Sequence, residues 1–101
     1  MSKKHIGSSF DDFLREEGLL AQAEAVAIKR VLAYQIAQAM REKGLTKVML
    51  AKMMGTSRAQ LDRLLDPENS SVTLQTLGRA AHVLGKNLMV EMEDKKRRKA
   101  A

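Results

Sequence analysis

Two short apolar stretches separated by a glycine constrain the fold of this chain most. They lie in the run "LAKMMGTSRAQLDRLL" at residues 50–65, where "GTS" holds them apart. Glycine enters the positive-φ region cheaply and Ser57 is suited to cap the second stretch, so we expect a tight turn at Gly55. Pro67 stops the second helix, because proline cannot continue one. The pattern predicts a helix-turn-helix unit at residues 46–65.

Further helix signals lie on both sides of this unit. Residues 19–43 contain neither proline nor glycine and are rich in alanine, which predicts one long helix. Residues 9–18, "SFDDFLREEG", predict a separate short helix with acidic residues in its first turn and Gly18 as its stop. Thr73 is suited to cap a later helix, "LQTLGRAAHVLG", which ends at Gly85.

The spacing of apolar residues predicts which side chains face inward. The expected inward positions are Ala25, Ile28, Leu32, Ile36, Ala39 and Met40 on the long helix, then Val48, Leu50, Ala51, Met54, Leu61, Leu64, Leu74, Leu77, Ala81 and Leu84. Val26, Val31 and Tyr34 cover more of the long helix than one core face needs. This surplus predicts a homodimer, because an all-round apolar helix needs a second surface.

The segment "NLMVEME" at residues 87–93 has the alternation of a strand, with Leu88, Val90 and Met92 on one side. A lone strand leaves its hydrogen-bonding edges unpaired, so we expect it to pair, most simply with its counterpart in a second copy. The predicted dimer surface is Val26, Val31, Tyr34, Leu88, Val90 and Met92.

Charge alone is a weak guide to partners. The formal net charge is +6, but "KKRRK" at residues 95–99 supplies five of the positive charges and leaves +1 for the rest. Residues 94–101 are expected to form a basic disordered tail, either solvated or an auxiliary contact to phosphate.

No sequence feature favours secretion, a membrane span or catalysis. The start "MSKKHIGSSFDDF" has no apolar run, no stretch approaches the roughly 20 apolar residues of a bilayer span, and there is no cysteine. His82 has no carboxylate at metal-ligand spacing, and no phosphate loop or nucleophile motif occurs. We expect a cytoplasmic protein that is not an enzyme and needs no cofactor or metal.

The second helix of the helix-turn-helix unit carries outward-facing side chains that packing does not require. They are Arg58, Ala59, Gln60 and Arg63. Arginine pairs with guanine and glutamine with adenine in the major groove, whereas Ala59 offers only a methyl contact. Lys47 and Ser57 lie at helix starts, which suit phosphate. The helix therefore predicts sequence-specific binding of double-stranded DNA.

Two stretches also resemble a known family. "LTKVMLAKMMGTSRAQLDRLLDP" resembles the Cro/C1-type (XRE) helix-turn-helix family, and "SVTLQTLGRAAHVLGKNLMVEME" is similar to its HigA-like antitoxin branch. The resemblance implies an all-α, lambda-repressor-like fold of four to five helices. It further implies a short helical arm at residues 1–20 and a DNA-binding domain at residues 21–93 that ends in a β-strand. The implied function is a dimeric repressor of its own operon on an inverted-repeat operator, paired as antitoxin with a RelE-like ribonuclease toxin.

The resemblance also assigns roles by position. It gives base reading to Arg58, Ala59, Gln60 and Arg63. It gives a phosphate contact to Lys47, where many relatives have glutamine. The loop "DPENSS" replaces a commoner glycine-containing turn, and Asn69 and Ser70 are the candidates for the phosphate contact of that turn.

An alternative function is mainly protein binding, with DNA binding secondary. Phe10, Phe13 and Leu14 form an apolar edge that either folds back on the body or docks on a partner. The arm carries net −1 over residues 1–20, which suits a basic ribonuclease toxin. RNA binding is less favoured, because only 3% of residues are aromatic and can stack on bases.

Overall fold

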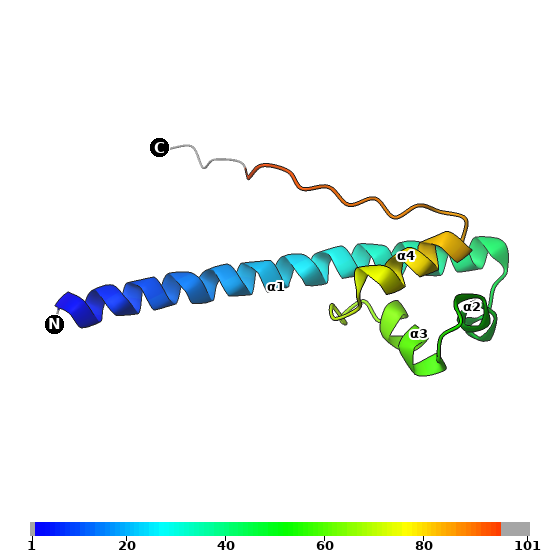
Figure 1. Cartoon of the computed structure of the whole chain (residues 1–101), viewed down its shortest axis with the longest axis horizontal. Helices are drawn as coiled ribbons and strands as arrows, with labels where there is room; N and C mark the ends of the chain where they lie inside the picture. Colours follow the sequence, from blue (N-terminus) through cyan, green and yellow to red (C-terminus); the bar gives the residue numbers. More distant parts are fainter. Residues whose placement is uncertain (1, 96–101) are drawn as a thin grey trace.

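Four helices follow one another along the chain. They are α1 (Ser2–Lys43), α2 (Lys47–Met54), α3 (Arg58–Leu65) and α4 (Leu74–Val83). The structure is a computed structural model that describes residues 2–95, with side chains described from residue 9 (Figure 1). Neither α1 nor any other helix in that range is long and apolar enough to cross a membrane.

Local side-chain chemistry explains where the short helices begin and end. The hydroxyls of Thr46, Ser57 and Thr73 each accept a hydrogen bond from the backbone N–H three residues later. These bonds satisfy donors that a helix start leaves free. Gly55 has φ 65° and closes α2, and Gly85 has φ 74° just beyond α4. The predicted caps and the predicted glycine turn are confirmed.

α1 is a single helix of 42 residues, so the separate short helix predicted for residues 9–18 is wrong. Gly18 lies within α1, and its φ is not among the positive values found for Gly44, Gly55 and Gly85. An interior glycine costs about 0.5–1 kcal/mol relative to alanine, which the good helix formers on either side offset. Figure 1 shows that the N-terminal half of α1 extends beyond the other three helices.

The core lies where the C-terminal half of α1 meets the short helices. Its buried residues are Ile36, Ala39, Met40, Leu50, Ala51, Met54, Leu61, Leu64, Leu77, Ala80 and Leu84. Four predicted inward positions are wrong: Ala25 is exposed, and Ile28 is 59%, Val48 52% and Leu74 67% exposed. On α1 the buried stripe continues from Ile36 through Ala33 to Lys29, at helical spacing, and this leaves Ile28 outside.

The C-terminal β-strand predicted at residues 87–93 is wrong, and the part of the chain that the structure describes contains no strand. Residues 86–95 instead run back alongside α1 without regular secondary structure (Figure 1). Leu88 packs against the core, whereas Val90 and Met92 are 68% and 98% exposed. A strand needs a neighbouring strand to complete its hydrogen bonds, and residues 2–95 provide none. The predicted tail at residues 94–101 lies outside the described range except for its first two residues.

Candidate nucleic-acid interface

The outward side of α3 is set by two leucines. Leu61 and Leu64 are both 0% exposed and hold one side of α3 against the core. The residues predicted to read bases all lie on the exposed remainder of this helix: Arg58, Ala59, Gln60 and Arg63. Because α3 has only 8 residues, these side chains share one short exposed surface, which is polar except at Ala59.

An acidic residue lies within this surface. Asp62 Oδ1 is 3.6 Å from Arg58 Nε and 3.6 Å from Lys47 Nζ, so one carboxylate connects α3 to the start of α2. The side chains of these three residues are about half exposed. The sequence interpretation did not single out Asp62, although its i, i+4 spacing from Arg58 is a recognised signal of an ion pair on a helix.

Hydrogen bonds orient the side chains at the start of α3. Gln60 Oε1 accepts a hydrogen bond from the Thr56 hydroxyl, and the backbone N–H of Gln60 donates to Ser57 Oγ. Gln60 and Arg63 also line a hollow of about 160 Å³ between α3 and the start of α4. Its other polar lining residues are Ser71, Thr73 and Thr76, none of which the sequence predicted as a phosphate contact. Hydroxyl groups beside an arginine suit an anionic oxygen such as that of phosphate.

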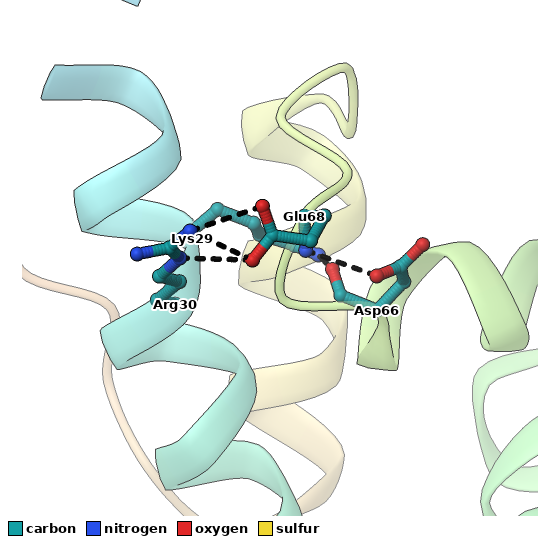
Figure 2. Close-up of polar contacts among 4 residues, drawn as sticks. All are labelled: Lys29, Arg30, Asp66 and Glu68. Carbon is teal, nitrogen blue, oxygen red and sulfur yellow. Dashed lines mark hydrogen bonds and ion pairs between the residues drawn. The ribbon is translucent and has the colours of Figure 1, made fainter. Parts of the chain in front are cut away.

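Lys29 of α1 forms hydrogen bonds with the C-terminal end of α3 and with the residue that follows it. It is only 3% exposed, and its Nζ donates hydrogen bonds to the carbonyl oxygens of Arg63 (3.0 Å) and Asp66 (2.7 Å), as Figure 2 shows in part. The last carbonyls of a helix lack partners within the helix and attract cations. Burial lowers the pKa of Lys29 from its usual value, and the charge of Asp66 acts in the opposite direction.

Arg30 makes the next connection between α1 and the loop after α3. Its Nε lies 2.9 Å from Glu68 Oε2 and its Nη2 lies 3.1 Å from Glu68 Oε1, a two-pronged ion pair (Figure 2). The hydrogen bond and the charge of Glu68 raise the pKa of Arg30. Both side chains are more than half exposed, so this pair is weaker than the contacts of the buried Lys29.

The other two predicted phosphate contacts lie in the same loop. Asn69 Oδ1 accepts hydrogen bonds from the backbone N–H (2.9 Å) and the hydroxyl (2.7 Å) of Ser71. Ser70 is exposed beside it. The asparagine oxygen therefore shapes a turn that contains no glycine.

The residues predicted to bind protein partners lie apart from α3. Phe10, Phe13 and Leu14 are 59%, 55% and 51% exposed on the extended half of α1 and do not fold back on the body. Val31 and Tyr34 are also exposed, whereas Val26 is partly covered. The structure does not bring Leu88 together with them on one open surface, because Leu88 packs against the core.

Comparison with known proteins supports the interpretation of α2 and α3 as a helix-turn-helix unit. The family model described as a helix-turn-helix domain matches residues 14–93, which is most of the chain. No curated protein and no solved structure gives a significant match. In helix-turn-helix units of DNA-binding proteins the second helix enters the major groove, and α3 holds the second position in this unit. The chain therefore belongs to the helix-turn-helix domain family.

Proposed function

We propose that the protein binds double-stranded DNA sequence-specifically through α3 and regulates transcription, most simply as a repressor of its own operon. One observation carries this proposal: the fully buried Leu61 and Leu64 leave Arg58, Gln60 and Arg63 exposed on α3. The membership of the helix-turn-helix family supports it.

The proposed interface divides into base reading and phosphate contact. Arg58 and Arg63 present guanidinium groups that suit guanine, and the Gln60 amide suits adenine. Ala59 offers its methyl group, for which the thymine methyl is the matching contact. Phosphate contacts come from Lys47 and from the polar groups at the starts of α3 and α4, with Asn69 and Ser70 in the loop between them.

Titrations of variants test this division between base reading and phosphate contact. They use a duplex that the wild-type protein selects from a random-sequence library and a duplex of scrambled sequence. Arg63→Ala should cost about 1–3 kcal/mol on the selected duplex and little on the scrambled one. Lys47→Ala should weaken both duplexes alike and reduce the salt slope by about 0.9 per protomer. Arg15→Ala, on the extended half of α1, is the control and should change neither duplex. A neutral Arg63→Ala together with a changed base preference in Lys47→Ala would reverse the two roles.

We further propose that the protein acts as a homodimer on an inverted repeat, with half-site centres about 34 Å apart. The exposed Val31 and Tyr34 on α1 motivate this step, because two large apolar side chains on one helix gain from a partner surface. Sedimentation should give twice the 11.2 kDa mass of the chain at micromolar concentration. A monomer mass, alone and on DNA, would remove the dimer from the proposal.

A second candidate function is neutralisation of a RelE-like ribonuclease toxin by the extended half of α1. Three large apolar side chains at Phe10, Phe13 and Leu14 are exposed there beside acidic residues, which favours a basic protein partner. Deleting residues 2–18 should abolish toxin neutralisation and leave DNA affinity unchanged. Phe13→Ser is the matched point variant, and Arg15→Ala is its neighbouring control. If the deletion abolished DNA binding instead, these residues would belong to the DNA-binding fold.

A further inference from the structure

Asp62 is a negatively charged residue on the surface that we propose binds DNA. It lies on the exposed side of α3 among the residues proposed to read bases, where its negative charge faces a polyanion. Aspartate on such a surface lowers the affinity for any DNA through its charge. Its position therefore needs a reason other than affinity.

The contacts of Asp62 suggest that reason. The same carboxylate oxygen lies 3.6 Å from Arg58 Nε and 3.6 Å from Lys47 Nζ. Arg58 is the first residue of α3 and Lys47 the first of α2, so the carboxylate joins one proposed base-reading group to one proposed phosphate-binding group. The three side chains are 49–60% exposed, and ion pairs at that exposure add little to folding stability.

What such a pair does instead is restrict the arginine. A free arginine side chain has many rotamers, and ordering it on DNA costs conformational entropy. A carboxylate beside Nε limits these rotamers and leaves the outer Nη groups free for the two acceptors of guanine. The same carboxylate partly neutralises the charges of Arg58 and Lys47 in the free protein. This reduces their non-specific attraction to the phosphates of DNA.

We propose that Asp62 is a specificity-determining residue that holds Arg58 for base reading and suppresses binding to DNA of unrelated sequence. The proposal rests on the DNA-binding function proposed above. Removing the charge of Asp62 while keeping its shape should raise the affinity for unrelated DNA more than the affinity for the selected site. The ratio of the two affinities should fall about five- to tenfold, at the lower end of what one base contact contributes.

The experiment uses the full chain and a duplex selected by the wild-type protein from a random-sequence library. Binding of Asp62→Asn to that duplex and to a scrambled duplex is measured at several salt concentrations. Asp12→Asn is the matched control, because Asp12 is also an exposed carboxylate beside an arginine, at 3.9 Å from Arg15, but lies on the extended half of α1. The control should leave the affinity ratio unchanged.

A double-mutant cycle with Arg58→Ala separates positioning from direct reading. If Asp62 acts through Arg58, Asp62→Asn should not change the base preference further once Arg58 is alanine. If Asp62 itself accepts a hydrogen bond from cytosine, the preference should change in both backgrounds, which would overturn the proposal. In the free protein, the Nε–H resonance of Arg58 should shift in Asp62→Asn while that of Arg63 stays in place.

Failure of this proposal is distinguishable from failure of the proposed function. A wild-type protein that selects no sequence from the library would overturn both. A wild-type protein that selects a site, with an unchanged affinity ratio in Asp62→Asn, would overturn only the role of Asp62. Thermal unfolding of Asp62→Asn should stay close to that of the wild type, so neither outcome is attributable to misfolding.

Discussion

Replacing Lys29 with methionine tests how α3 is held. Methionine is similar in length and fills the same space, but it cannot donate the two hydrogen bonds to the carbonyl oxygens of Arg63 and Asp66. Lys29 is 3% exposed, so water cannot readily replace the lost donors without opening the contact between α1 and α3. The variant thus removes the lysine donor from both carbonyls, and the Asp66 carbonyl keeps only its hydrogen bond from the backbone N–H of Asn69.

The expected cost follows from these two bonds. A hydrogen bond from a charged donor contributes about 1.5–3 kcal/mol, so the pair contributes roughly 3–6 kcal/mol before other terms. Burying the ammonium group is itself unfavourable, as the lowered pKa of Lys29 indicates, and the apolar methionine avoids that penalty. We expect a net loss of about 2–4 kcal/mol, which is a large share of the stability of a domain of this size.

Chemical unfolding of Lys29→Met and of a control, Lys52→Met, measures this cost. Lys52 is exposed on α2, so its replacement should change the free energy of unfolding by less than about 0.5 kcal/mol. Amide hydrogen exchange should also speed up at the C-terminal end of α3 in Lys29→Met. An unfolding free energy equal to or above that of the wild type would refute the reasoning, because the burial penalty would then outweigh both hydrogen bonds.

Three further outcomes are expected. The folded-state pKa of Lys29 lies below its usual value of 10.5, so the folded protein loses this proton at a lower pH than the unfolded chain. The stability of the wild type relative to Lys29→Met should therefore rise as pH increases toward 10.5. A stability difference in urea unfolding that does not change with pH would contradict this. Gly55→Ala should cost more than about 1 kcal/mol in thermal unfolding, because φ 65° strains an L-residue. Glu68→Gln should cost only about 0–1 kcal/mol, and less at high salt, because its pair with Arg30 is exposed.

The features that sequence predicted well depend on residues close together in the chain. A capping hydroxyl such as that of Ser57 bonds to a backbone group three residues away, and the turn at Gly55 depends on the glycine itself. The spacing of Leu61 and Leu64 similarly lies within one turn of α3. Such signals are complete within a short window, and they were enough to place α2, α3 and α4.

The extended segment after α4 shows where prediction from local sequence patterns fails. The alternation around Leu88 and Val90 is typical of a strand, but strand formation depends on a partner that no local pattern guarantees. Leu88 finds its place against the core, while Val90 remains exposed. Similarly, Gly18 is a helix stop only where the chain adopts positive φ, and its helix-forming neighbours favour continuation instead.

The N-terminal part of the buried face of α1 could not be predicted from hydrophobicity, because a lysine lies on it. Adjacent residues on a helix point about 100° apart, so Ile28 and Lys29 cannot both lie on the narrow buried stripe that also contains Ala33 and Ile36. Hydrophobicity alone favours Ile28. The carbonyls that favour Lys29 belong to residues 34 and 37 positions further along the chain, and they converge only once α3 has ended at its loop. The partners that stabilise the buried Lys29 are backbone carbonyls at the end of another helix. Backbone carbonyls have no sequence signature, so the burial of Lys29 could not be predicted from the sequence.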